Sequence, residues 1–169
     1  MLMWILTVLA IITGVKGYAD GYFPQVCDSM EVQHNSGSTP INPQNSELPY
    51  KIEIHPPTGQ QIRVTLKADP GHYFRGFMLE ARRPNTNAVG TFIVADTSLI
   101  RLLTCNNVKG SAVSNHNNRK KDKVEVDWIS DGQDQDIFFR ATFVETYSVF
   151  WRPNDTEVIS LTTTPKPSS

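Results

Sequence analysis

The sequence predicts an all-β fold, an immunoglobulin-like antiparallel β-sandwich with one disulfide. From Tyr50 onward, apolar and polar residues alternate in short runs, which is the period of a half-buried strand. Turn residues such as "PPTG", "RPNTN" and "SDGQDQ" separate these runs at near-regular intervals. No run shows a helical period of useful length. Seven or eight short alternating strands with regular turns are typical of a sandwich.

Each expected strand places one set of alternate side chains on a buried face. "YKIEI" puts Tyr50, Ile52 and Ile54 on one side, and "FRGFMLEAR" can bury Phe77, Leu79 and Ala81. In chain order, the expected strands lie within residues 50–54, 61–67, 74–82, 90–96, 99–105, 123–129, 136–145 and 147–153. Trp128, within "KVEVDWI", is expected in the core, where it could pack beside the disulfide as in related sandwiches.

The first residues predict a secreted protein. Leu2 to Ile12 is an apolar run too short to span a bilayer, and small residues follow it, so residues 1–17 are interpreted as a signal peptide. Cleavage after Gly17 and cleavage after Ala19 both fit the pattern. The alternative is a buried N-terminal helix, but the run has no amphipathic period. No later run reaches membrane length, so no transmembrane anchor is expected.

Two cysteines, Cys27 and Cys105, follow this leader. An even count in an oxidising compartment predicts one disulfide, whereas two buried free thiols are the alternative. The bond would tie the irregular N-terminal segment to the strands. We expect one domain over residues 20–153 and a flexible Thr/Ser/Pro-rich tail over 154–169. Asn154 begins an Asn-Asp-Thr sequon for N-glycosylation.

The sequence offers no catalytic constellation, no metal site and no cofactor motif. The four histidines are scattered, without the close spacing of a zinc site (His34, His55, His72 and His116). The acidic turn "DGQDQD" could suggest calcium, but its spacing is not that of an EF-hand, and carboxylates are common in turns.

A basic cluster is the main candidate for ligand binding. Four cations occupy five consecutive positions (Arg119, Lys120, Lys121 and Lys123). Net charge is only −1, so steering to nucleic acid is not implied and any anion binding must be local. One interpretation is a binding site for phosphate or carboxylate groups. The other is the solvated end of a β-hairpin, where charges improve solubility and protect strand edges.

Ordered landmarks along the chain resemble the reeler domain: "GYFPQVC", "LPYKIEI", "FRGFMLEAR", Cys105, "AVSNHNNRKKDKVEVDW" and "FFRATFVETYSVFW". The resemblance is strongest to small secreted insect defence proteins made of a signal peptide and one such domain. It implies an immunoglobulin-like sandwich, a location in haemolymph and no catalytic motif. It also implies binding to microbial surface polymers (lipopolysaccharide, lipoteichoic acid, β-glucan) or to the haemocyte surface.

Two functions therefore compete at this point. The first is a secreted, non-enzymatic immune defence protein that binds microbial surface components or promotes haemocyte responses to bacteria. The second is an extracellular structural or signalling module that binds a host protein. Family members fused to membrane ferric reductases also exist, but this sequence lacks the transmembrane helices and haem-ligating histidines that such an activity would require.

Overall fold

The chain folds as an antiparallel β-sandwich, which confirms the predicted fold class. The computed structural model describes residues 21–84, 87–132 and 135–161. The predicted signal peptide therefore lies outside the described residues. In chain order the elements are the 3₁₀ turn η1 (Pro24–Val26) and the strands β1 (Asn35–Ser36), β2 (Thr39–Pro40), β3 (Tyr50–Ile54), β4 (Gln61–Ala68), β5 (Gly76–Arg82), β6 (Thr91–Ile93), β7 (Ile100–Cys105), β8 (Val108–Asn115), β9 (Lys123–Ile129), β10 (Gln135–Thr146), β11 (Val149–Phe150), β12 (Asn154–Asp155) and β13 (Ile159–Leu161).

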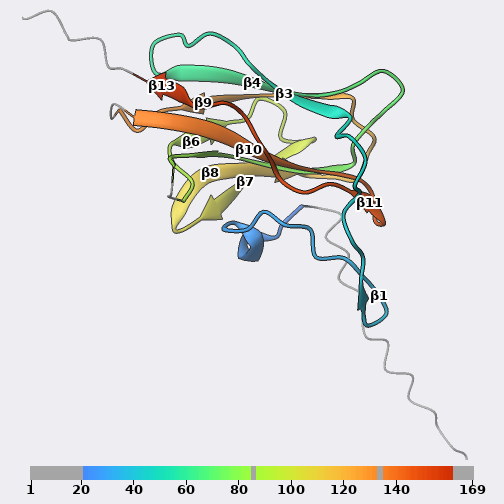
Figure 1. Cartoon of the computed structure of the whole chain (residues 1–169). Coiled ribbons are helices and arrows are strands. Elements are labelled where there is room, and N and C mark those ends of the chain that lie inside the picture. Colours follow the sequence, from blue (N-terminus) through green and yellow to red (C-terminus); the bar gives the residue numbers. More distant parts are fainter. Residues whose placement is uncertain (1–20, 85–86, 133–134, 162–169) are drawn as a thin grey trace, which may run out of the picture.

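Two sheets form the layers of the sandwich (Figure 1). The larger sheet has the order β11-β10-β5-β8-β7, and β12 and β13 also pair with β10. The smaller sheet has the order β3-β4-β9-β6. A short separate hairpin joins β1 to β2 within a long polar loop. Every pairing between these strands is antiparallel, as expected for alternating strands joined by turns.

The main core lies between the two sheets. β4 contributes Ile62, Val64 and Leu66, while β10 contributes Phe139 and Phe143 from the opposite layer. All five side chains are buried, as the period-2 pattern predicts. The face predicted for β5 (Phe77, Leu79, Ala81) also lies in this core.

Trp128 is fully buried in this core and shows why Gly90 is required. Its ring meets Phe139 edge to face at 5.8 Å, and its indole nitrogen donates to the Val89 carbonyl at 2.9 Å. A Cβ on Gly90 would lie 2.4 Å from the ring, and Gly90 has a φ of +64°. Trp128 and the disulfide belong to different clusters, so the expectation that they pack together is wrong.

The outer face of the larger sheet carries a second buried cluster. Cys27 and Met30, from the N-terminal segment, pack on Met78 of β5, Leu103 of β7 and neighbouring residues. Figure 1 shows this N-terminal segment, in blue, lying against the larger sheet on the side away from the smaller one. The predicted disulfide between Cys27 and Cys105 is confirmed, with a Cα separation of 5.6 Å. It ties the segment to the end of β7.

The predicted boundary at residue 153 is too early. Asn154–Asp155 and Ile159–Leu161 form β12 and β13 on β10 instead of starting a flexible tail. Arg140 of β10 binds Asp155 through two bonds of 2.6 and 2.7 Å, and the backbone amide of Phe139 donates to the Thr156 hydroxyl. These contacts explain why a polar segment stays on the sheet. The remainder of the predicted tail, residues 162–169, lies outside the described residues.

Candidate anion-binding surface

The basic cluster lies on the connection between the two sheets. β8 ends at Asn115 in the larger sheet, and β9 begins at Lys123 in the smaller one. The intervening residues therefore cross from one layer to the other and do not close a β-hairpin. Phe74 holds this crossover through reciprocal backbone bonds with Lys121, each of 2.9 Å. The alternative interpretation as a hairpin end is thus wrong in its geometry.

Lys121 is buried within the crossover, with 5% of its surface exposed. Its ammonium donates to the carbonyl oxygens of Arg75, Asn117 and Arg119 at 2.9, 2.9 and 2.8 Å. Burial lowers the pKa of Lys121 to about 8, and the nearby charges of Arg75 and Arg119 act in the same direction. The sequence grouped this lysine with the ligand-binding cations. In the structure Lys121 instead has an internal role, because its ammonium binds the carbonyl oxygens of Arg75, Asn117 and Arg119.

Three other cations lie on or beside the crossover, half-buried Arg75 and exposed Arg119 and Lys120, and we call them the basic surface. The Lys120 ammonium lies 4.0 Å from the centre of the Tyr73 ring, and the Arg75 guanidinium lies 5.7 Å from it. Arg75 also donates to the Asn118 carbonyl at 3.0 Å. Arg119 is exposed, on the same loop.

Arg75 is absent from the cluster predicted from the sequence because it lies 43 positions before its partner Asn118 and reaches the loop only in the fold. Lys123, which the sequence placed in the group, lies on β9 and pairs with Glu125 at 3.1 Å. The basic surface thus comprises two guanidinium groups and one ammonium on or beside the crossover, and the charges of both arginines act on Lys121. Guanidinium groups bind phosphate and carboxylate through paired hydrogen bonds, and an ammonium adds a compact charge.

Replacing Lys121 with methionine should destabilise the protein by about 1–3 kcal/mol, because three gathered carbonyls would lose their charged donor. Urea denaturation at pH 7 measures this loss. The matched control is Lys120→Met, which removes an exposed neighbour together with its contact to the Tyr73 ring and should change stability by less than about 1 kcal/mol. Equal effects of the two substitutions would contradict the internal role of Lys121.

The histidines remain separate in the fold. His34 stacks on Tyr147 with ring centres 4.2 Å apart, while His55 contacts the hydroxyl of Thr65 at 2.9 Å. In the part of the chain that the structure describes, one group of three side chains has metal-binding atoms within reach of one another: Cys27, Glu80 and Cys105. Both cysteines are oxidised, so their sulfurs do not act as thiolate ligands. In the acidic turn, Asp131 pairs with Arg83 at 2.7 Å.

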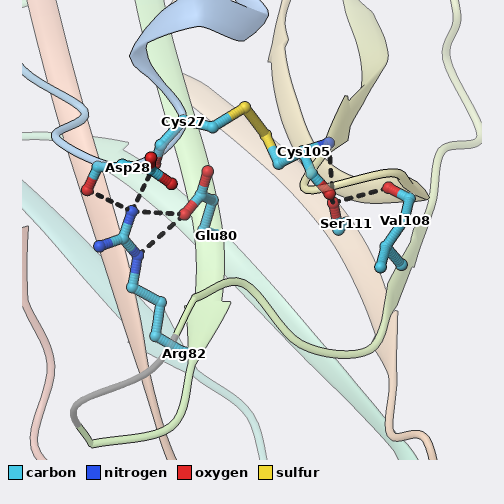
Figure 2. Close-up of a disulfide and its surroundings, with 7 residues drawn as sticks. All are labelled: Cys27, Asp28, Glu80, Arg82, Cys105, Val108 and Ser111. Atoms are coloured by element: carbon cyan, nitrogen blue, oxygen red, sulfur yellow. Dashed lines mark hydrogen bonds and ion pairs between the residues drawn. A yellow bond between two sulfur atoms is a disulfide. The ribbon is translucent and has the colours of Figure 1, made fainter.

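A buried ion pair lies beneath the disulfide (Figure 2). Arg82 binds Glu80 through contacts of 2.7 and 2.8 Å, and it donates to the carbonyls of Cys27 and Asp28 at 2.5 and 3.0 Å. The second Glu80 oxygen, Oε1, has no hydrogen-bond partner among the described residues. Burial raises the pKa of Glu80 to about 7, against the opposing charge of Arg82. The pair fastens the N-terminal segment to β5.

The sequon at Asn154 lies on β12, where Asn154 pairs with Ala141. The Thr156 hydroxyl accepts from Phe139 and donates to the Glu157 carbonyl, each at 2.9 Å. Residues 154–159 line one side of a groove of about 670 Å³, and residues 50–57 line the other. Glycosylation of Asn154 remains a prediction from the sequence.

No helix within the described ranges is long and apolar enough to cross a membrane.

A family model for the Reeler domain matches residues 25–167. Ferric-chelate reductase 1 of Mus musculus is 35% identical over 161 residues, which cover 90% of this chain and 26% of that protein. The chain therefore spans about a quarter of the length of this relative.

Two further proteins are similar over a larger share of their own length. Defense protein l(2)34Fc of Drosophila melanogaster is 31% identical over 158 residues, covering 88% of this chain and 93% of that protein. Among solved structures, the Reelin-N domain of F-spondin has a TM-score of 0.55 and 23% identity, over 68% of this chain and 88% of that one. At that identity, the structural likeness supports the fold alone.

Proposed function

Because the chain belongs to the reeler domain family, we propose that it is a secreted, non-enzymatic defence protein that binds anionic polymers on microbial surfaces. The observation that carries this proposal is the match to the Drosophila melanogaster defence protein, which extends over nearly the whole length of both chains. The ferric-chelate reductases match over only about a quarter of their length, so the activity in their name has less support for this chain.

The basic surface supports a particular class of ligand. Lipopolysaccharide and lipoteichoic acid carry phosphates, and Arg75, Arg119 and Lys120 offer several cationic donors around one exposed loop. The overall charge of the chain is −1, so this attraction is local and should be sensitive to salt. β-glucan is uncharged and should bind weakly through this surface.

Changing Arg119 and Lys120 together to serine should reduce binding to lipopolysaccharide and lipoteichoic acid about tenfold at low salt, because about two charge-assisted contacts are lost. Co-sedimentation with Gram-negative, Gram-positive and fungal cells across a salt series, alongside the purified polymers, measures the effect. Lys121 stays unchanged so that the loop keeps its conformation.

The matched control removes two cations outside the loop, Lys109 on β8 and Arg63 on β4, also by change to serine. It has the same net charge as the test variant and should bind like the wild type. If both variants lose binding equally, bulk charge explains the attraction and the basic surface is not the site. If the wild type binds no microbe or polymer but binds haemocytes saturably, a host-surface receptor replaces the microbial ligand.

A further inference from the structure

β3 is the terminal strand of the smaller sheet, and it pairs with β4 alone among the strands of the described chain. The hydrogen bonds at its two ends fix which backbone groups face outward. The Asp69 amide donates to the Pro49 carbonyl at 2.9 Å, and the His55 amide donates to the Arg63 carbonyl at 3.0 Å. In an antiparallel ladder the bonded positions alternate, so odd-numbered residues of β3 bond to β4. The amides and carbonyls of Tyr50, Ile52 and Ile54 therefore point away from β4, in the plane of the sheet and toward its open edge.

Open space lies beside this edge. The groove of about 670 Å³ runs along β3 and the turn that follows it, with the segment 154–159 as its opposite wall. Figure 1 shows this red C-terminal segment running past β3 toward β13. Ile52, Ile54 and Ile159 are only partly buried against the core, and Val158 is 56% exposed. The groove thus combines an unpaired strand edge with apolar side chains, which is an arrangement that favours the addition of another strand.

The sequence of β3 is complementary to itself. When two copies of Tyr50–Ile54 run antiparallel about a two-fold axis at Ile52, Lys51 of each copy faces Glu53 of the other. This register makes the outward positions 50, 52 and 54 the hydrogen-bonded pairs, each exchanging both backbone bonds. Lys51 and Glu53 then occupy non-hydrogen-bonded pairs, in which opposing side chains lie closest. Prolines limit the strand at both ends (Pro49, Pro56 and Pro57).

We propose that the β3 edge is a self-association surface, through which two copies of this chain form a symmetric dimer with a continuous sheet across both smaller sheets. The strand that pairs with this edge comes from a second copy of the chain, because the same five residues supply both the outward backbone groups and the complementary charges. The pairing is short, so the dimer is weak and depends on protein concentration. The proposal is independent of the ligand that the basic surface binds.

Charge reversal tests the register. Lys51→Glu creates two Glu–Glu contacts across the two-fold axis, and Glu53→Lys creates two Lys–Lys contacts. Each variant should self-associate about tenfold more weakly than the wild type, since like charges directly opposite one another destabilise a strand pair. An equimolar mixture of the two variants should recover association, because both carboxylates of the first variant then face lysines of the second. Sedimentation equilibrium at micromolar to millimolar concentrations measures the association constants.

Lys109→Glu is the matched control, since it changes the net charge as Lys51→Glu does but lies on β8. It should associate like the wild type. The lost intramolecular pairs, Lys51–Asp69 and Glu53–Lys67, are exposed, so all variants should fold, which thermal unfolding verifies. A wild type that stays monomeric to millimolar concentration overturns the proposal and leaves the groove to an extended peptide of another protein. A mixture that associates no better than its components overturns the register.

Discussion

Replacing Arg82 with methionine is expected to lower the free energy of unfolding by about 3–5 kcal/mol at pH 8. The change leaves the buried Glu80 carboxylate without its partner and removes the donor from the carbonyls of Cys27 and Asp28. Guanidinium chloride denaturation measures the loss. Hydrogen exchange over residues 21–30 should also accelerate, because the N-terminal segment is held partly by these bonds.

Two controls separate the buried pair from a general loss of charge. Arg63→Met breaks an exposed pair with Asp127 on the smaller sheet and should cost less than about 1 kcal/mol. The double variant Arg82→Met/Glu80→Leu removes both buried charges, so it should be more stable than Arg82→Met alone. A double variant as unstable as the single one would mean that packing, and not the orphaned charge, causes the loss.

Glu80→Gln should change how stability depends on pH. The pKa of Glu80 is raised from 4.5 to about 7 in the folded protein, so the folded state holds this proton more tightly than the unfolded state. The stabilisation from the protonated group is fully present below about pH 4.5 and is lost as pH rises through 7. The wild type should therefore lose about 3 kcal/mol between pH 4.5 and pH 8 through this group.

The glutamine side chain does not titrate, so the unfolding free energy of the variant should lack the pH dependence that the Glu80 carboxyl contributes. The difference between the two proteins across a pH series isolates Glu80 from the other titrating groups. The charges that act on this carboxyl are Arg82, Asp28 and Arg140, which both proteins retain. Parallel pH curves for the wild type and the variant would show that the pKa of Glu80 is the same in the folded and unfolded states, which would contradict the raised pKa.

The strands with strict alternation could be predicted from the sequence, and β8 could not. β3 and β9 have one apolar and one polar side, and they lie where the pattern places them. The segment "GSAVSN" of β8 is buried throughout, because the core covers one side and the N-terminal segment covers the other. Small residues on both faces leave no period to detect. The preceding Asn106 and Asn107 both have positive φ, the backbone conformation of the tight hairpin turn that joins β7 to β8.

The same contrast holds for the candidate site. The cluster of cations and the cysteine pair could be found by counting residues. The burial of Lys121 could not, since one of its carbonyl partners, on Arg75, lies 46 positions earlier in the chain. Likewise, "MLEAR" does not show that Glu80 and Arg82 lie under a segment from the N-terminus. β12 and β13 have two and three residues, which is too short for any periodicity to appear.

The two ends of the folded region should respond differently to mechanical load. Tension applied ahead of Cys27 reaches Cys105 and the end of β7 through a covalent bond, without first opening the sandwich. Tension applied at Leu161 instead meets three residue pairs between β13 and β10, which are held by noncovalent contacts. Three such pairs resist less load than a covalent disulfide. A domain held at both ends would therefore yield first at its C-terminal strands, while the N-terminal attachment stayed closed.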